Sequence, residues 1–302
     1  MFWTLLYYVY VYLDDAEKLV DQHLKFCKEL GIKGRVLIAD EGLNGTVSGT
    51  PQQCKAYMKF IESDKRFEGI EWKIDEVDVV SFAKMHVRYR PEIVNSGLRA
   101  KGVDPLEETG VHLSPTEFKA MKNQENVIVL DVRSNYEHNV GRFQGALTLD
   151  IDNFREFPNQ LDQLEAYKGK KILTYCTGGV KCEKASAFLL KKGFEEVYQL
   201  HGGIINYGKI EGGEDFEGNC YVFDNRVQIP VNTVNPSIIS TCHNCGVKSV
   251  RIINCANPHC NNHLVQCEAC GIELKGNCTI QCSMSPATRP YNNKGYYTKN
   301  SE

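Results

Sequence analysis

The segment Lys171-Ile172-Leu173-Thr174-Tyr175-Cys176-Thr177-Gly178-Gly179-Val180-Lys181-Cys182 decides the fold of the central part of the chain. Its stretch up to Tyr175 is short and largely apolar, as in a buried parallel strand. A loop with two adjacent glycines follows, and apolar residues then recur at helical spacing until Gly193. A strand, a glycine-containing loop and a helix in this order predict one unit of a parallel α/β sheet.

Strands and helices alternate on both sides of this unit, from residue 114 to about 210, which predicts a whole parallel α/β domain. A second apolar run, residues 127–130, ends at Asp131. In such sheets the chemistry gathers beyond the carboxyl ends of the strands. Asp131, Arg133 and Cys176 all fall there, so we take them as candidate site residues.

Cys176 is the residue that we expect to react. Loop amides and the start of a helix stabilise negative charge, so a cysteine between a strand and a helix should have a lowered pKa and act as a thiolate. Gly178 and Gly179 allow the backbone to turn its N–H groups around the sulfur. The alternative is an inert cysteine buried at a strand end, which we consider weaker because such glycine loops are uncommon by chance.

Cys182 limits the chemistry that the loop can perform. A cysteine-dependent phosphatase needs Arg six positions after its nucleophile to hold a phosphoryl group, and Cys182 stands at that position here. The sequence therefore disfavours a phosphatase. Cys182 itself is either a resolving thiol or a small core residue at the start of the helix.

The N-terminal residues predict a second domain. Residues 4–12 suit a strand, and residues 14–30 suit a helix that ends at Gly31. A hairpin is expected next, with strands at 34–39 and 46–49 and a turn at 40–45. A second helix should begin at residue 50, and further extended segments are expected within 70–80 and 82–90. This β-α-β-β-α-β order is ferredoxin-like, or acylphosphatase-like.

One strand of that domain has a cationic face. Between residues 83 and 90 apolar and basic side chains alternate, so Lys84, His86, Arg88 and Arg90 should share one side. Such a row suits a nucleic-acid backbone, and these residues are candidate RNA contacts. A solvated strand face is the simpler alternative.

The last part of the chain is rich in cysteine. Four pairs are present: Cys242 with Cys245, Cys255 with Cys260, Cys267 with Cys270, and Cys278 with Cys282. Two sulfurs in a short turn are what tetrahedral zinc requires, so eight ligands predict two structural zinc ions. The pairs could combine sequentially or in an interleaved manner, and iron–sulfur ligation is a less favoured alternative.

These patterns divide the chain into four stretches: a ferredoxin-like domain over 1–92, a linker over 93–112, an α/β catalytic domain over 113–225 and a cysteine-rich zinc-binding region over 226–302. The glycines and prolines after residue 90 favour the linker. The predicted fold class is therefore a multidomain α/β protein.

Composition excludes several classes of protein. The 302 residues are 42% hydrophobic and 24% charged with a formal charge of -3, which argues against a strongly basic nucleic-acid binder. No apolar run is long enough for a membrane helix. Residues 1–13 lack the basic leading segment of a secretory signal, so we expect a buried strand there and a cytoplasmic protein without a membrane partner. The oligomeric state is left open.

The loop also resembles that of the rhodanese superfamily. Supporting fragments are Asp131-Val132-Arg133, Tyr136-Glu137, Gly141-Arg142-Phe143-Gln144-Gly145-Ala146 and Leu200-His201-Gly202-Gly203. This resemblance implies that Cys176 opens an anion-cradling loop and carries sulfur as a persulfide. It also implies that Asp131 and Arg133 shape the pocket.

A narrower resemblance, to the bacterial tRNA uridine hydroxylase family, spans nearly the whole chain. Its carriers are residues 34–46, Lys84-Met85-His86-Val87-Arg88, Phe154-Arg155-Glu156-Phe157-Pro158, Tyr175-Cys176-Thr177-Gly178-Gly179, Cys182-Glu183-Lys184-Ala185 and Cys255-Ala256-Asn257-Pro258-His259-Cys260. The family implies a tRNA substrate, molecular oxygen as co-substrate, and formation of 5-hydroxyuridine at the wobble position.

Two positions depart from that family. Val180-Lys181 stands where the family usually carries Ile-Arg, and lysine keeps the charge but loses the two-pronged hydrogen bonding of arginine. Arg142 stands where the family commonly has His.

No flavin, nicotinamide or iron facial-triad pattern is evident in the sequence. One hypothesis is therefore that Cys176 adds to C6 of uracil and makes C5 electron-rich enough to react with oxygen. Two other functions stay open: a sulfurtransferase that carries a persulfide, and a non-catalytic RNA-binding scaffold.

Overall fold

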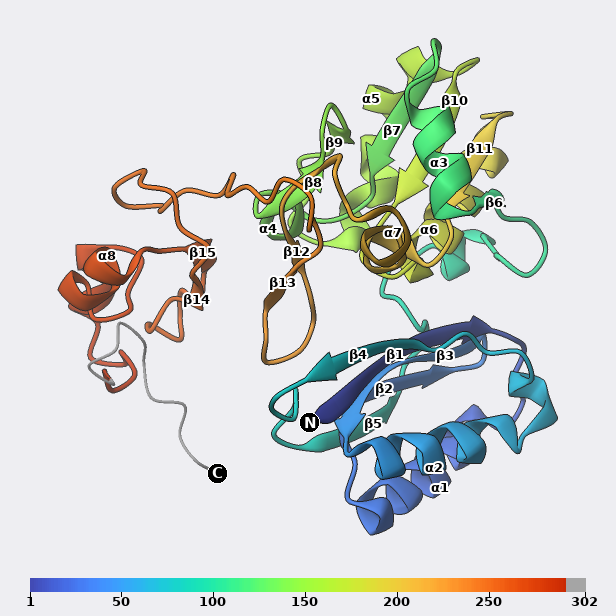
Figure 1. Cartoon of the computed structure of the whole chain (residues 1–302), viewed down its shortest axis with the longest axis horizontal. Helices are drawn as coiled ribbons and strands as arrows, with labels where there is room; N and C mark the ends of the chain where they lie inside the picture. The colour runs from blue at the N-terminus through green and yellow to red at the C-terminus, as the bar shows by residue number, and fades with distance from the viewer. Residues whose placement is uncertain (292–302) are drawn as a thin grey trace.

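The computed structural model describes residues 1–291 and shows three parts along the chain: an N-terminal part in blue and teal, a central part in green and yellow, and a cysteine-rich part in orange and red (Figure 1). None of the described helices is long and apolar enough to cross a membrane. Of the region predicted at 226–302, residues 292–302 lie outside the described part.

The N-terminal part is one sheet with two helices on one face (Figure 1). Its elements are β1 (Phe2–Tyr10), α1 (Ala16–Leu30), β2 (Lys33–Ala39), β3 (Gly42–Gly49), α2 (Pro51–Glu62), β4 (Lys73–Val77) and β5 (Met85–Tyr89), with a 3-10 turn at Lys65–Phe67. The strand order is β4-β1-β3-β2-β5. The predicted β-α-β-β-α-β order is confirmed, and β5 adds an edge strand parallel to β2.

The hairpin between β2 and β3 is tighter than the sequence predicted. Ala39 already pairs with Gly42, so the expected turn over residues 40–45 shrinks to its first two residues. Gly42 and Gly45 of this segment instead allow β1 to lie close to β3, because neither carries a side chain. A Cβ at Gly42 would lie 2.0 Å from the Val9 carbonyl oxygen, and one at Gly45 would lie 2.3 Å from Tyr7 Oη.

The central part is built on a second sheet. Its elements are β6 (Val111–Leu113), α3 (Pro115–Lys122), β7 (Val127–Asp131), α4 (Asn135–His138), β8 (Gly141–Phe143), β9 (Leu147–Thr148), α5 (Leu161–Leu164), β10 (Lys171–Tyr175), α6 (Val180–Lys191), β11 (Val197–Leu200) and α7 (Gly203–Glu211), with 3-10 turns at Phe154–Gln160 and Glu165–Tyr167. The strand order is β6-β11-β10-β7-β9, and every pair is parallel. The predicted parallel α/β domain is confirmed.

Residues 93–112, predicted as a linker, pack against the central part. Val94, Leu98 and Val103 are buried in its hydrophobic core, and β6 begins at Val111. A 3-10 turn lies at Arg99–Lys101.

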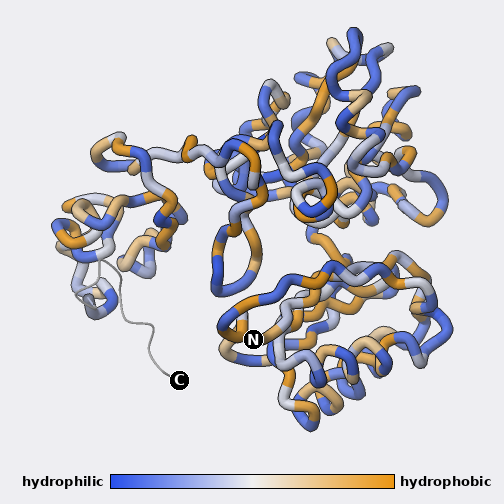
Figure 2. The backbone as a smooth tube through the Cα atoms, viewed as in Figure 1, coloured by the Kyte–Doolittle hydropathy of each residue, from blue (hydrophilic) through white to orange (hydrophobic). Residues whose placement is uncertain are grey.

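The chain ends in small sheets and short helices. β12 (Phe216–Tyr221) lies between β13 (Gln228–Pro230) and β8 in a three-stranded sheet. The cysteine-rich part follows with β14 (Ile252–Asn254), β15 (His263–Val265), α8 (Glu268–Glu273) and α9 (Ile280–Ser283). Figure 2 shows that apolar stretches recur along the strands of the two larger sheets, whereas the cysteine-rich part has a small core of its own.

The face of the N-terminal sheet opposite α1 and α2 meets α6 of the central part. Along β1, Leu5 and Tyr7 enter the core beneath the two helices. The alternate residues reach the other domain, because Tyr8 Oη donates to Glu183 Oε1 at 3.0 Å and Tyr10 Oη donates to the Val180 carbonyl at 3.2 Å.

Candidate active site

Cys176 lies between β10 and α6, as predicted. It is buried, and its sulfur accepts a hydrogen bond from the backbone N–H of Gly179 at 3.2 Å. Gly179 has a φ of 106°, a backbone conformation that favours glycine. The loop therefore turns its amides toward the sulfur, which is the geometry expected for a stabilised thiolate.

The surroundings of Cys176 favour its charged form. Burial by itself raises the pKa of a thiol, but a hydrogen bond from Cys182, the positive charge of Lys181 and the amides of Gly179 and Lys181 outweigh it. Together they lower the pKa of Cys176 to about 6. Most of this cysteine is therefore thiolate at neutral pH.

Cys182 lies in the hydrophobic core of the central domain and is fully buried. Burial and the adjacent Cys176 hold its pKa well above the usual value. It therefore keeps its proton and donates it in a hydrogen bond to the Cys176 sulfur. Cys182 is thus a core residue in contact with the reactive sulfur, and a resolving role for it stays a prediction.

A cavity of about 230 Å³ opens above Cys176, between the loop and the open face of the N-terminal sheet. The central domain contributes Cys176, Thr177, Gly178, Val180, Lys181 and Phe223, the N-terminal sheet contributes Leu6, Tyr8, Arg35, Leu37, Asn44, Gly45 and Thr46, and the segment after that sheet contributes Ile93, Val94 and Asn95. No sequence pattern gives a site role to the lining residues outside the central domain. Residues 34–46 were the only sequence signal for this side of the cavity. They carry part of the family resemblance, but that resemblance gives none of them a role in the site.

The two glycines of the loop are needed for this approach of the domains. A Cβ on Gly178 would lie 2.8 Å from Leu6 Cδ2, and a Cβ on Gly179 would lie 2.8 Å from Tyr8 Oη. A side chain at either position would therefore require the Leu6 or Tyr8 side chain to move from its place in the cavity wall.

Lys181 holds a positive charge at the cavity wall. Its Nζ lies 2.5 Å from Glu137 Oε2 and 5.3 Å from the centre of the Phe223 ring. Lys181 thus has a buried carboxylate to orient it, and its charge acts on Cys176.

Asp131 and Arg133 do not line the cavity. Both are fully buried, and Arg133 Nη2 donates to Asp131 Oδ2 at 2.7 Å. Tyr175 Oη donates to the same oxygen at 2.6 Å, and Arg133 also donates to the Gly141 carbonyl at 2.7 Å. The pair therefore braces the ends of β7 and β10 behind the loop.

The predicted basic row lies on the same sheet face as the cavity. Along the parallel pair of β2 and β5, Arg35 is opposite His86 and Leu37 is opposite Arg88. Arg35 and Leu37 line the cavity, so His86 and Arg88 lie on the strand next to it. The whole row is exposed but does not itself line the cavity: Lys84, His86, Arg88 and Arg90. Within residues 1–291 none of these four, nor Arg35, makes an ion pair with a carboxylate.

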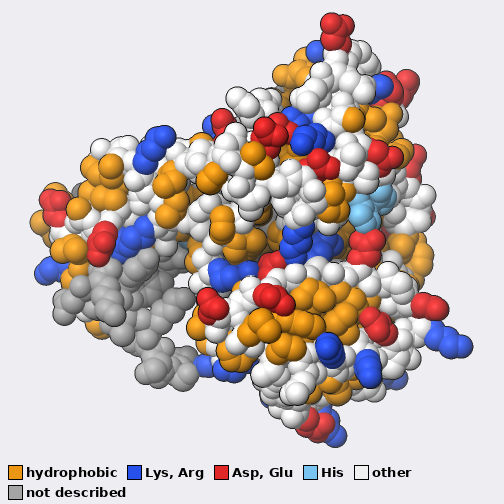
Figure 3. All heavy atoms as spheres, viewed as in Figure 1, with side chains coloured by type: hydrophobic (Ala, Val, Ile, Leu, Met, Phe, Trp, Pro, Cys, Tyr) orange, Lys and Arg blue, Asp and Glu red, His pale blue; other side chains and the backbone are white. Residues whose placement is uncertain are grey.

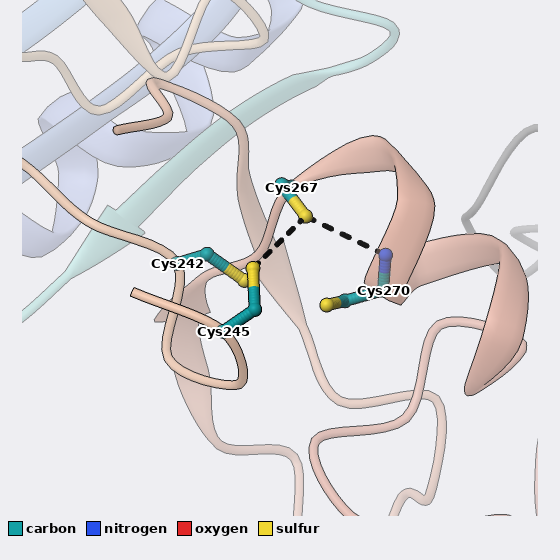
Figure 4. Close-up of side chains that lie close together, drawn as sticks. All are labelled: Cys242, Cys245, Cys267 and Cys270. Atoms are coloured by element: carbon teal, nitrogen blue, oxygen red, sulfur yellow. Dashed lines mark hydrogen bonds between the residues drawn. The ribbon is translucent and has the colours of Figure 1, made fainter. Parts of the chain in front are cut away.

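The eight cysteines gather into two clusters, each of which could hold a metal ion. Cys242, Cys245, Cys267 and Cys270 form the first, shown in Figure 4, and Cys255, Cys260, Cys278 and Cys282 form the second. Within a cluster all sulfurs lie within 4.8 Å of one another. The first pair combines with the third and the second with the fourth, so of the two arrangements that the sequence left open the structure has the interleaved one.

Comparison with known families agrees with this architecture. The UPF0176 acylphosphatase-like domain matches residues 2–93, the rhodanese-like domain matches residues 114–209 and a rhodanese C-terminal region matches residues 217–283. The resemblance to rhodaneses is confirmed.

Three curated relatives carry the name tRNA uridine(34) hydroxylase. The relative from Cytophaga hutchinsonii is 58% identical and the alignment covers 98% of this chain and 94% of that protein. The relative from Bacillus licheniformis is 48% identical, with 94% and 88% covered, and that from Lactococcus lactis is 46% identical, with 95% and 90% covered. At this identity over nearly the full length of each relative, the chain belongs to the tRNA uridine(34) hydroxylase family.

Proposed function

We propose that this protein hydroxylates C5 of uridine 34 in tRNA to give 5-hydroxyuridine, with molecular oxygen as co-substrate and Cys176 as the reacting residue. The observation that carries the proposal is the Cys176 sulfur, which accepts a hydrogen bond from the Gly179 amide and lines a cavity built jointly by two domains. Its surroundings lower the pKa of this thiol to about 6. The relatives are named for hydroxylation of uridine 34 in tRNA, which supports a hydroxylation at this nucleoside. We expect the protein to act in the cytoplasm, where tRNA is present and thiols stay reduced.

The thiolate supplies a route to an electron-rich C5. When Cys176 adds to C6, a carbon–sulfur bond forms and the electrons of the C5–C6 double bond move to C5 and the O4 carbonyl. C5 then reacts with oxygen. A proton from solvent converts the resulting C5 peroxide to a hydroperoxide. One oxygen atom then stays on C5 and the other leaves as water, with two electrons and two protons supplied by an external dithiol that is oxidised to a disulfide. Loss of the C5 proton and of the thiolate restores the double bond.

The basic row supports binding of the RNA backbone. Enzymes that act on one base swing it out of its stack into a pocket, and their affinity comes mainly from contacts to phosphates. We propose that Arg35, His86 and Arg88 hold phosphates beside the cavity while the uracil enters it. Arg88→Glu should weaken tRNA binding and reduce its dependence on salt.

The two cysteine clusters fit structural zinc. Sulfurs bound to one zinc at about 2.3 Å stand about 3.8 Å apart. Cys245 and Cys267 have their sulfurs 3.7 Å apart, and Cys260 and Cys278 have theirs 3.6 Å apart. We propose one zinc ion in each cluster, where it would hold together a region with little hydrophobic core.

The proposal is tested with purified protein, unmodified tRNA and a reductant under ¹⁸O₂. Digestion of the tRNA and mass spectrometry should find 5-hydroxyuridine at position 34 with one heavy oxygen atom. Heavy oxygen incorporated only from labelled water would exclude the oxygen-dependent reaction. Sulfur transfer from thiosulfate without any change in the tRNA would favour the sulfurtransferase instead.

A further inference from the structure

Tyr8 of β1 brings a phenol group to the Cys176 cavity from the other domain. It lines the cavity, and its oxygen packs against Gly179 of the reactive loop. Burial and the nearby Glu183 raise the pKa of Tyr8 well above its usual value, so the hydroxyl stays neutral. The hydroxyl donates to Glu183 Oε1 at 3.0 Å, which leaves the phenol oxygen free to act as an acceptor.

Glu183, in the first turn of α6, connects Tyr8 to the surface. Its buried carboxylate also accepts from His112 Nε2 at 2.8 Å, Thr109 Oγ1 at 2.9 Å and Gln199 Nε2 at 2.9 Å. Burial opposes the charge, but these donors, with His112 foremost, hold the pKa of Glu183 below its usual value. The side chain of His112 is 42% exposed, and its hydrogen bond to Glu183 raises its pKa.

Hydrogen bonds therefore run without a break from the cavity through Tyr8, Glu183 and His112 to solvent. Other charged groups face this path. Lys73 Nζ lies 5.2 Å from the centre of the Tyr8 ring, and the Cys176 thiolate acts on Tyr8 from the loop. Glu71 and His201 are the neighbours of His112, with the two imidazole rings 5.6 Å apart.

The other ionisable residues that line the described cavity offer no such path. Arg35 stays protonated at any pH of interest. Lys181 pairs with Glu137, whose side chain is fully buried and whose Oε1 has no hydrogen-bond partner among the described residues. A proton passed in that direction would stay inside the protein.

We propose that Tyr8 is the catalytic base that removes the C5 proton in the last step, and that Glu183 and His112 relay a proton to solvent. This inference rests on the proposed function, which requires a base at C5. The C5–H bond breaks and its electrons form the C5–C6 double bond, while the C6–S bond breaks and its electrons return to Cys176. The proton goes to the Tyr8 oxygen as Tyr8 gives its own to Glu183, and the protonated His112 ring, whose Nε2–H bonds to Glu183, releases its Nδ1 proton to solvent.

The first test compares Tyr8→Phe with Tyr12→Phe in the full-length protein. Tyr12 is a matched control, because its hydroxyl also donates to a carboxylate, Asp104 Oδ2 at 2.8 Å, but lies outside the cavity. Tyr8→Phe should lower single-turnover hydroxylation at least about 100-fold while a covalent adduct between Cys176 and the RNA accumulates. Tyr12→Phe should stay within about threefold of the wild type.

The second test uses His112→Ala, a surface substitution that should leave the fold intact. Hydroxylation should slow about tenfold and recover when imidazole is added, because a small base in solvent can replace the missing ring. A purely structural role of His112 would not respond to imidazole.

Three results would overturn the relay: wild-type turnover in Tyr8→Phe, loss of adduct formation together with turnover in Tyr8→Phe, or no effect of imidazole on His112→Ala. Failure of the proposed function itself would appear elsewhere, as absence of 5-hydroxyuridine with the wild type or full activity of Cys176→Ser. The two failures are therefore distinguishable.

Discussion

Cys176 combines deep burial with acidity, two properties that usually oppose each other. The interior of a protein disfavours a thiolate, so a buried cysteine normally has a raised pKa, as Cys27 and Cys54 do. Cys176 differs because its sulfur receives hydrogen bonds and faces a cation. The donor that contributes most is another thiol, Cys182.

Alkylation of Cys176 by iodoacetamide should become faster as the pH rises through about 6, because only the thiolate reacts. In Cys182→Ala the lost hydrogen bond should move this midpoint upward by about one pH unit. The measurement is mass spectrometry of the peptide that contains Cys176 after timed exposure at several pH values. Cys54→Ala, which removes a buried thiol from the other domain, should keep the original midpoint; equal midpoints in all three proteins would contradict the account.

Gly179→Ala should destabilise the protein and abolish its activity, because the new Cβ would meet Tyr8 in addition to straining the backbone. Gly169→Ala separates the two effects. Gly169 also has a positive φ, of 83°, but nothing lies within 4 Å of an added Cβ. Chemical denaturation should show a loss of about 1 kcal/mol for Gly169→Ala and a clearly larger loss for Gly179→Ala. Similar losses would mean that Tyr8 does not press on the loop.

Among single residues, the sequence predicts the reactive role of Cys176 and the position of its loop, because the strand, the glycines and the helix are adjacent in the chain. Tyr8 and Arg35 could not be assigned in the same way. Alternation in a strand indicates that they share a face with other residues, but not which domain that face meets. Asp131 and Arg133 were correctly located at a strand end, yet their side chains turn inward toward Tyr175 rather than to the cavity.

Among the elements, the cysteine-rich part shows most plainly what local spacing leaves undecided. Each cysteine pair is set by a short turn and is visible in the sequence. Which pairs combine depends on how the β14–β15 hairpin and α8 fold back on the chain, and only the structure gives that arrangement.

Purified protein should contain two zinc ions per chain, measured by plasma mass spectrometry. Cys245→Ser should lower the content toward one, since the second cluster keeps its four sulfurs. Cys54→Ser should leave it at two, because Cys54 belongs to neither cluster. Iron in place of zinc, or two zinc ions in Cys245→Ser, would contradict the assignment.

For the whole molecule, the position of the two domains determines the site. Charged side chains of both signs lie along the seam between them (Figure 3), including Lys209 with Asp75 at 2.6 Å and His201 with Glu71 at 2.7 Å. Deeper inside, Lys184 of α6 is fully buried and lies 2.6 Å from Glu41 Oε2 in the hairpin turn of the N-terminal sheet. This contact between domains could not be predicted from sequence, because a lysine or a glutamate considered alone is expected to be exposed to solvent.

Lys184→Met should destabilise the protein by about 3–5 kcal/mol, because it leaves buried carboxylates without their partner. Hydroxylation should fall as well, since the cavity depends on both domains. Lys168→Met is the control, because Lys168 forms a partly exposed pair with Glu165 and should cost less than about 1 kcal/mol. Urea denaturation measures both variants, and equal stabilities would show that the buried pair does not join the domains.

The central claim is that Cys176 performs the hydroxylation of tRNA. The most direct measurement is nucleoside mass spectrometry of tRNA from cells that lack this protein and receive either the wild type or Cys176→Ser at equal expression. We predict 5-hydroxyuridine at position 34 with the wild type and none with Cys176→Ser, because a serine hydroxyl is not ionised at neutral pH and cannot replace the thiolate. Equal amounts of 5-hydroxyuridine in the two strains would contradict the claim.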